Sequence, residues 1–288
     1  MTMIAAGDGT AAGAAAARRE APEGHSRSAA RPAVVEAKGL SLVFQTADAP
    51  VRALDNIDLL IERGEFVSLI GPSGCGKTTL MRVIADLEQP TEGSIRINGS
   101  TPEQARLARS YGYVFQAPAL YPWRNVERNV QLPLEVMGMS KEERTARSDR
   151  ALETVGLSGF KKKFPWQLSG GMQQRVSIAR AMSFEPDLLL MDEPFGALDE
   201  ITRDNLNVHL LDLWNRTNLT VVFVTHSIPE AVFLSSRIVV MSPRPGRIVE
   251  VIDSDLPRGR DLDIRETPAF LEVAHRVRVA LREGHSYD

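Results

Sequence analysis

A glycine-rich segment, Gly71-Pro-Ser-Gly-Cys-Gly-Lys-Thr-Thr79, constrains the fold of this chain more than any other part of its sequence. It lies between an apolar run at Phe66–Ile70 and apolar residues at helical spacing over Thr78–Leu87. Glycines let successive backbone N–H groups converge on phosphate oxygens, and a following helix adds the positive end of its dipole. The segment therefore predicts a strand, a phosphate-binding loop and a helix. A glycine-rich turn that matches by chance is the alternative, and the strand and helix flanks argue against it.

Every residue of this loop is a candidate nucleotide contact. Lys77 is expected to reach the β- and γ-phosphates, and Thr78 to ligate Mg²⁺ through its hydroxyl. Cys75 is the only cysteine, and we expect it to supply backbone rather than redox chemistry. Because one cysteine cannot form an internal disulfide, the chain fits a reducing compartment. The candidate contacts are Gly71, Pro72, Ser73, Gly74, Cys75, Gly76, Lys77, Thr78 and Thr79.

Two carboxylates follow an apolar run at Leu188–Met191, which predicts a buried parallel strand. Strand ends are where α/β folds place their ligands. Asp192 is expected to hold Mg²⁺, and Glu193 to orient and deprotonate an attacking water. An acidic turn after a strand is the alternative interpretation, and the phosphate loop elsewhere in the chain argues against it.

A second anion-binding helix start is predicted at Leu168-Ser-Gly-Gly-Met-Gln-Gln-Arg175. Ser169, Gly170 and Gly171 precede a helical segment, so their backbone N–H groups and the helix dipole favour phosphate. The chain thus has two phosphate sites for a single triphosphate. We therefore expect the second site to act across a dimer.

These segments together resemble the ABC ATPases, whose signature begins Leu-Ser-Gly-Gly, and the resemblance runs from Val34 to about Val251. It implies Mg-ATP as cofactor and ATP hydrolysis as activity. The implied fold is α/β: a P-loop ATPase domain with a RecA-like core, an antiparallel β subdomain and an inserted helical subdomain. Met172 stands where the common signature has glutamine, which leaves the backbone role of Ser169, Gly170 and Gly171 unaffected.

The resemblance also implies roles for four further residues. Phe44 corresponds to the aromatic that stacks on adenine, although a plain strand-core role is the alternative. Gln116 corresponds to the glutamine that contacts Mg²⁺ and water and relays nucleotide state to a permease. Asp199 matches the loop that touches the partner subunit, and His226 matches the histidine on the γ-phosphate.

Short β-branched runs separated by turn residues predict the strands. The first are expected at Val34–Ala37, Ser41–Phe44 and Ile57–Ile61, some of them antiparallel. Later strand signals alternate with helices, as expected of a parallel sheet, and they lie at Leu188–Met191, Val221–Thr225 and Ile238–Met241.

Residues 1–33 are rich in alanine and glycine without a periodic apolar face, which predicts a disordered tail. A transit peptide is the alternative, although such peptides avoid acidic residues. Residues 34–255 are predicted as the ATPase domain, with the helical subdomain at about 117–167, and residues 256–288 as a short helical tail. We expect that tail to pack rather than to lie on a membrane, through one apolar face formed by Phe270, Leu271, Ala274, Val277 and Leu281.

Among ABC subunits the chain resembles the importer ATPases of the nitrate, sulfonate and taurine group. The stretches that carry this similarity are Leu120–Val126, Phe195–Thr202 and Met241–Arg247. The similarity implies a second copy of the chain, two permease subunits and a solute-binding protein as partners, at the cytoplasmic face of the cell (inner) membrane. A pyrimidine-like heterocycle or bicarbonate is the alternative substrate.

The composition argues against nucleic-acid-binding and membrane-spanning proteins. The 34 Lys and Arg against 37 Asp and Glu leave a charge of −3, so no positive field favours nucleic acid. The apolar runs fall short of the roughly 20 residues that a membrane helix needs. A soluble ABC ATPase of DNA repair or translation remains as one alternative, and a phosphate-loop kinase or GTPase as another.

Overall fold

The computed structural model describes residues 31–284. The predicted disordered tail falls almost entirely outside the described residues, and its last residue, Ala33, is the first of a strand. Within residues 31–284, no helix combines the length and the apolar character that crossing a bilayer requires.

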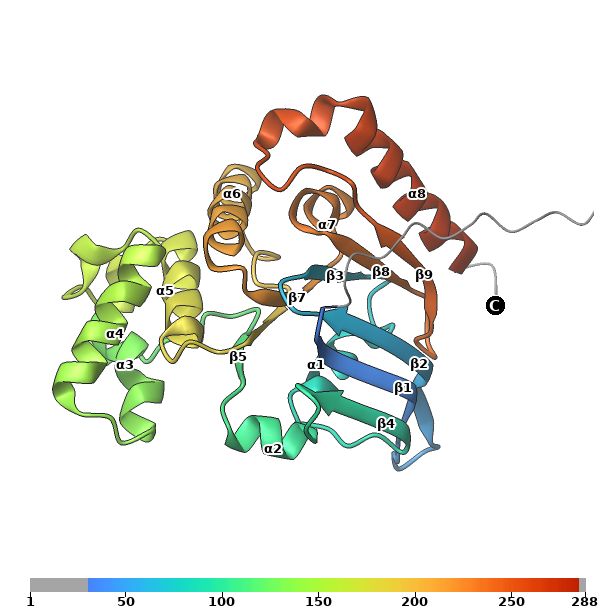
Figure 1. The fold of residues 1–288 in the computed structure, drawn as a ribbon, viewed down its shortest axis with the longest axis horizontal. Helices are drawn as coiled ribbons and strands as arrows, with labels where there is room; N and C mark the ends of the chain where they lie inside the picture. Colours follow the sequence, from blue (N-terminus) through green and yellow to red (C-terminus); the bar gives the residue numbers. More distant parts are fainter. Residues whose placement is uncertain (1–30, 285–288) are drawn as a thin grey trace, which may run out of the picture. The chain divides into compact units, whose positions relative to one another are not determined.

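A six-stranded sheet forms the centre of the fold (Figure 1). Its strand order is β5-β6-β7-β3-β8-β9, and all neighbours are parallel except β8 and β9. The strands are β3 (Phe66–Ile70), β5 (Tyr111–Val114), β6 (Leu188–Asp192), β7 (Thr220–Thr225), β8 (Arg237–Met241) and β9 (Ile248–Asp253).

The continuous apolar runs of the central strands reflect burial on both faces of this sheet. Alternate residues serve the two faces: Val221 and Phe223 of β7 join one core cluster, whereas Val222 and Val224 join the other. The first cluster packs under α6 (Glu200–Thr217), α7 (Ile228–Leu234) and α8 (Pro268–Gly284). Helix α1 (Lys77–Ile84) belongs to the second cluster, between this sheet and a smaller one.

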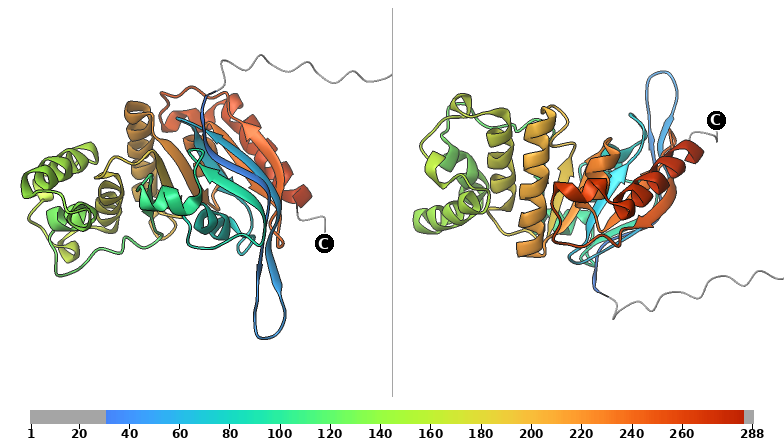
Figure 2. Two further views of the ribbon diagram at one scale, coloured as in Figure 1. Left: turned by 60° about the horizontal axis from the view of Figure 1, so that its bottom comes forward. Right: turned by 90° about the horizontal axis from the view of Figure 1, so that it is seen from above.

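The smaller sheet is antiparallel, with the order β2-β1-β4. Its strands are β1 (Ala33–Phe44), β2 (Val51–Glu62) and β4 (Glu92–Ile97), and the turn between β1 and β2 extends away from the neighbouring elements (blue in Figure 2). We expected two strands over 34–44, and this was wrong. Gly39, at φ +55°, lies where the pairing register shifts, so a bulge joins both segments into one strand.

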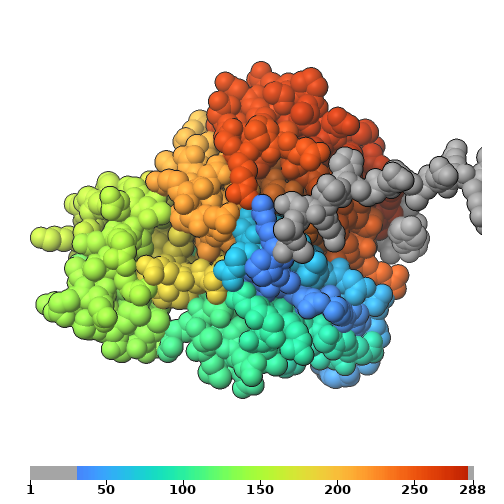
Figure 3. Space-filling model, in the orientation of Figure 1, coloured from blue at the N-terminus to red at the C-terminus, as the bar shows by residue number. Residues whose placement is uncertain are grey.

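Residues 126–182 form a helical lobe that gathers on one side of the space-filling surface (Figure 3). Its helices are α3 (Val126–Val136), α4 (Lys141–Thr154) and α5 (Gly170–Met182). Side-chain caps fix where they begin: Asn125 accepts from the Arg128 N–H, and Ser140 forms a capping box with Glu143. The predicted α/β fold class with a parallel sheet, an antiparallel sheet and a helical insert is confirmed.

The terminal helix α8 packs against β8, β9 and α7. Its buried residues are Phe270, Ala274, Val277, Ala280 and Gly284. We expected Leu271 on this face, but its side chain is 57% exposed. One residue along a helix is a rotation of about 100°, so Leu271 cannot share the face that Phe270 buries.

Gly112 of β5 lets the lobe approach the sheet closely. A Cβ at this position would lie 2.4 Å from the carbonyl oxygen of Ala181 in α5. Gly112→Val should therefore force β5 and α5 apart and lower the free energy of unfolding by about 1–3 kcal/mol. Urea unfolding followed by circular dichroism measures this.

Gly259→Ala is the matched control, because a Cβ at Gly259 meets nothing within 4 Å and its φ is not positive. An unchanged unfolding midpoint in Gly112→Val would show that the close approach of β5 and α5 contributes nothing to stability.

Candidate nucleotide-binding site

The strand order brings the predicted site residues to one edge of the central sheet. The neighbours β5, β6, β7 and β3 are parallel, so their carboxyl ends meet there. Gln116 follows β5, Asp192 ends β6 with Glu193 directly after it, and His226 follows β7. The Gly71–Thr79 loop follows β3. Four segments far apart in the sequence thus share one site.

The loop itself is held in a conformation that requires glycine. Gly74 and Gly76 have φ angles of +75° and +103°, which side-chain-bearing residues rarely adopt. A Cβ at Gly76 would also lie 2.9 Å from the carbonyl oxygen of Ala53. Helix α1 begins directly afterwards at Lys77 and includes Thr78 and Thr79, so its N-terminus opens toward the loop.

Lys77 is folded back over the loop and is 5% exposed. Its Nζ donates to the carbonyl oxygens of Gly71 at 2.8 Å and Pro72 at 2.9 Å. The ammonium group is therefore fixed at the hollow of the loop by backbone acceptors. A phosphate placed there would meet a charge that is already oriented.

A hydrogen-bonded chain of three side chains crosses from α1 to the sheet. Thr78 Oγ1 donates to Asp192 Oδ1 at 3.0 Å, and the Tyr113 hydroxyl donates to Asp192 Oδ2 at 3.3 Å. Burial raises the pKa of Asp192, while both hydrogen bonds lower it. Burial and the Asp192 charge together raise the pKa of Tyr113 well above its usual range, so it stays a donor.

Glu193 turns out of the strand with a left-handed φ of +45°, and its N–H donates to the Val224 carbonyl at 3.1 Å. Its carboxylate Oε2 lies 3.6 Å from His226 Nδ1. A Cβ at Gly196 would be 3.8 Å from Glu193 Oε2 and 3.7 Å from Gln116 Nε2. The structure thus brings Glu193, His226 and Gln116 to one small region.

Cys75 is buried at 1% exposure, and burial raises the pKa of its thiol. The opposing effect of Lys77, whose Nζ lies 3.7 Å from the sulfur, is smaller. The thiol form is therefore favoured, which makes a nucleophilic thiolate at this position unfavourable.

Ser169 caps the N-terminus of α5 by accepting from the Met172 N–H at 3.3 Å. The two glycines after it, Gly170 and Gly171, have no side chains, so their backbone packs closely against the segment that follows β6. A Cβ at Gly170 would lie 3.2 Å from Leu198, and one at Gly171 only 2.7 Å from the Thr202 methyl. Met172 contributes its backbone N–H to the cap and packs partly buried against the core.

Asp199 and Phe44 lie at the margins of the site. Asp199 caps α6, and its pKa is lowered because its carboxylate accepts from the Thr202 N–H at 2.9 Å. Phe44 is the last residue of β1 and is half-buried against the core between the two sheets. Its stacking on adenine stays a prediction.

Residues that sequence reasoning missed connect the site to the helical lobe. Gln174 Nε2 of α5 donates to the Phe115 carbonyl at 3.2 Å. Arg180, further along α5, donates to the carbonyls of Pro118 at 2.8 Å and Ala119 at 2.7 Å. The helix that begins at Ser169 therefore holds the loop that carries Gln116. Tyr113 was also missed, because a tyrosine in a short strand carries no motif.

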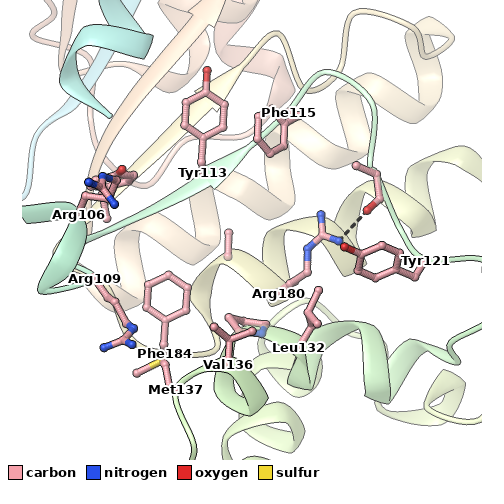
Figure 4. Close-up of a pocket in the computed structure, with 14 residues that line it drawn as sticks. Arg106, Arg109, Tyr113, Phe115, Tyr121, Leu132, Val136, Met137, Arg180 and Phe184 are labelled. Carbon is pink, nitrogen blue, oxygen red and sulfur yellow. Dashed lines mark hydrogen bonds between the residues drawn. The ribbon is translucent and has the colours of Figure 1, made fainter. Parts of the chain in front are cut away.

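A groove of about 600 Å³ lies where this loop meets the lobe (Figure 4). Tyr113 and Phe115 line it from the side of β5, and Leu132 and Val136 line it from α3. Val136 is 76% exposed and Phe115 is 47% exposed. Arg106 and Arg109 add positive charge to this largely apolar wall.

Comparison with known proteins places the fold and the site in one family. A family model described as ABC transporter matches residues 54–196. An uncharacterized ABC transporter ATP-binding protein of Methanocaldococcus jannaschii is 46% identical over 249 residues, covering 86% of this chain and 91% of that protein. The chain belongs to the ABC transporter ATP-binding proteins. It is an ATPase, and its cofactors are ATP and Mg²⁺.

Two further similarities bear on function. The taurine import ATP-binding protein of Rhizobium johnstonii is 45% identical over 236 residues, covering 80% of this chain and 89% of that protein. A dimeric structure of a bacterial ABC transporter cassette matches with a TM-score of 0.67 and 37% identity, over 76% of this chain and 98% of that one.

The residues of this ABC ATPase fit a magnesium ion that is bound together with nucleotide. Thr78 and Asp192 place a hydroxyl and a carboxylate oxygen 3.0 Å apart, and Mg²⁺ prefers oxygen ligands. Among residues 31–284 there is no cluster of three or more His, Cys, Asp and Glu side chains that could hold a metal. Phosphate and water oxygens are therefore needed to complete an octahedral shell.

Tyr113→Phe tests the hydrogen-bonded chain of Thr78, Asp192 and Tyr113. Without the hydroxyl, Asp192 loses a hydrogen bond that favours its carboxylate form, and we expect the Mg²⁺ concentration for half-maximal ATPase activity to rise about three- to tenfold. Tyr111→Phe is the control, since its hydroxyl donates to the Ala85 carbonyl, away from Asp192. Equal Mg²⁺ dependence in both variants would exclude Tyr113 from the metal site.

Proposed function

We propose that this ABC ATPase powers an importer: two copies close head to tail around ATP, and their closure moves two permease subunits. The imported solute is a small anion such as taurine, another sulfonate or nitrate, delivered by a solute-binding protein. The chain is held at the cytoplasmic face of the cell membrane through the permease. The similarity to a taurine import protein supports the substrate class.

The arrangement at the sheet edge supports a division of roles among the site residues. Glu193 orients the attacking water and accepts its proton, while His226, 3.6 Å away, holds the γ-phosphate side of the site. Gln116 contacts the water and the metal. Mg²⁺, when bound at Thr78 and Asp192, neutralises charge that develops on the phosphates.

Nucleotide contact by the remaining loop residues rests on backbone N–H groups and on Lys77. When phosphate enters the hollow, Lys77 exchanges its two carbonyl partners for phosphate oxygens. This exchange replaces neutral acceptors with charged ones, which strengthens the hydrogen bonds. Phe44 stacks on the adenine at the edge of the smaller sheet.

The head-to-tail dimer follows from where Ser169 lies. Its hydroxyl caps α5 by accepting from the Met172 N–H, and the glycines that follow pack closely against Leu198 and Thr202. A helix N-terminus of this kind favours phosphate. We propose that it completes the site of the second copy, with Asp199 at the same interface, as the similarity to a dimeric cassette supports.

The observation that carries the transporter role is the groove between β5 and α3. Its apolar wall is exposed in the isolated chain, and exposed patches of this kind mark interaction sites. A short helix of a permease fits such a groove. The neighbouring loop is held by Gln174 and Arg180 of α5, so the groove and Gln116 are mechanically connected.

Glu193→Gln separates nucleotide binding from turnover. We expect kcat to fall by at least about a hundredfold, because the general base is lost, while ATP binding persists. Light scattering should then find a dimer when ATP is present. Glu153→Gln, an exposed position on α4, should behave as the unsubstituted protein. A monomeric Glu193→Gln protein saturated with ATP would contradict the dimer mechanism.

Val136→Glu tests the groove. Because Val136 is 76% exposed, the substitution leaves the fold and the basal ATPase activity intact. A buried charge in the occupied groove should reduce solute uptake at least about tenfold. Val251→Glu, at a 43% exposed position on β9, is the control. Unchanged uptake in Val136→Glu would exclude this groove as the permease contact.

The substrate is tested by uptake in cells that lack the gene. We expect the entry of labelled taurine, alkanesulfonate or nitrate to fall and to return with the intact gene. A selective loss of pyrimidine or bicarbonate uptake would replace the anion proposal with one of those alternatives. Normal entry of all of these solutes, with a chain that copurifies only with soluble nucleic-acid factors, would favour a non-transport ABC ATPase.

A further inference from the structure

The turn between β8 and β9 lies directly against the phosphate loop, although some 170 residues separate them in the sequence. We call residues Ser242–Arg247 the buttress turn. A Cβ at Gly246 would lie 2.1 Å from the Cys75 carbonyl oxygen, and one at Gly71 would lie 2.8 Å from the Met241 carbonyl oxygen. Such distances leave no room for side chains between the two backbones.

The buttress turn is internally fixed. Ser242 Oγ donates to the Pro245 carbonyl at 3.1 Å and accepts from the Arg247 N–H at 3.0 Å. Arg247 in turn pairs with Asp55 of β2 through Nε at 2.8 Å. Gly246 joins the same strand, since its N–H donates to the Ala53 carbonyl at 2.9 Å. The turn is therefore tied to β2, which also touches the loop at Gly76.

Arg244 extends from this turn to the tip of the loop. Its Nη2 donates to the Gly74 carbonyl oxygen at 3.4 Å, and it would be 3.6 Å from a Cβ at Gly74. The side chain is exposed, so this contact does not serve the hydrophobic core. It joins a permanent cation to one specific peptide of the phosphate loop.

The geometry of a trans peptide determines where the N–H groups beside these carbonyls point. In each peptide unit the C=O and the following N–H point in opposite directions. Arg244 donates to the Gly74 carbonyl on one side of the Gly74–Cys75 peptide, and the Cys75 N–H on the other side donates to the Pro72 carbonyl at 3.3 Å within the loop, a partner that a phosphate oxygen would replace. The Cys75 carbonyl packs on Gly246, so by the same peptide geometry the Gly76 N–H points away from the buttress turn.

We propose that the buttress turn preorganises the phosphate loop, with Arg244 as a positioning residue that orients the Gly74–Cys75 peptide toward the phosphates. This inference rests on the nucleotide site and adds a residue outside its motifs. Arg244 acts on the backbone N–H groups that meet the β-phosphate, which ATP and ADP share. Loss of the Arg244 side chain therefore weakens the binding of both nucleotides and leaves the rate of hydrolysis in the bound complex unchanged.

The test compares Arg244→Ala, Arg244→Lys and the unsubstituted full-length chain. We expect Arg244→Ala to raise KM for ATP and the Kd values of ATP and ADP by about three- to tenfold, as for one exposed charge-assisted hydrogen bond. kcat should stay within about twofold. Arg244→Lys should recover part of the affinity, because an ammonium group can still reach a carbonyl oxygen.

Arg96→Ala is the matched control, since Arg96 is an exposed arginine that donates to another glycine carbonyl, that of Gly99, at 3.0 Å. It should leave KM, Kd and kcat unchanged. Titration calorimetry gives the Kd values, and a coupled phosphate-release assay gives KM and kcat.

Three results would overturn the inference. Unchanged KM and Kd in Arg244→Ala would show that the contact has no effect on the loop. A weaker affinity for ATP with an unchanged affinity for ADP would indicate that Arg244 contacts the γ-phosphate instead. A lower kcat at unchanged KM would make it part of the hydrolytic step. Absence of ATP hydrolysis in the unsubstituted chain would instead contradict the proposed function itself.

Discussion

The backbone conformation of the Gly71–Thr79 loop, with Gly74 and Gly76 at positive φ, is the constraint on which the rest of the site depends. Backbone carbonyls of the loop are contacted by groups from other parts of the chain as well as by its own lysine. Two side chains donate to loop carbonyls, and one backbone segment packs against another. Lys77 takes the first two carbonyls, Arg244 takes that of Gly74, and the backbone at Gly246 packs on that of Cys75. We therefore infer that the β8–β9 turn, which is tied to β2 of the smaller sheet through Asp55 and Ala53, serves nucleotide binding.

A second dependence runs along α5. This helix begins at Ser169, a candidate phosphate contact, and its later residues Gln174 and Arg180 hold the loop after β5. Burial lowers the pKa of Arg180, yet its two carbonyl partners compensate for part of the lost hydration. One helix thus connects the end that we propose faces the second copy, the loop of Gln116 and the groove. Coupling between nucleotide and permease needs such a connection.

Sequence patterns succeeded where a chemical need fixes residue type and order. Buried parallel strands gave unbroken apolar runs at Leu188–Met191 and Val221–Thr225, and strands lie there. The patterns failed where hydrogen bonding to a neighbouring strand decides whether a segment is a strand. We did not predict β4, β5 or β9, because each is short or partly exposed and is a strand by virtue of its neighbour. We predicted Leu271 on the buried face because it is apolar and adjacent in sequence to Phe270, but apolar character alone does not show which face of the helix a residue occupies.

The sequence alone determined the local features of this protein: a phosphate loop, a strand that ends at Asp192 and is followed by Glu193, a second helix start that we propose binds phosphate, and membership of the ABC family. These features are local, since each occupies a few consecutive residues whose types are required by phosphate or metal. Only the tertiary structure decided which distant groups support them. Tyr113 reaches Asp192, and Arg244 reaches Gly74, across strand neighbours that the order β5-β6-β7-β3-β8 creates. A single tyrosine or arginine carries no local signal, because its role comes from the backbone that packing places beside it.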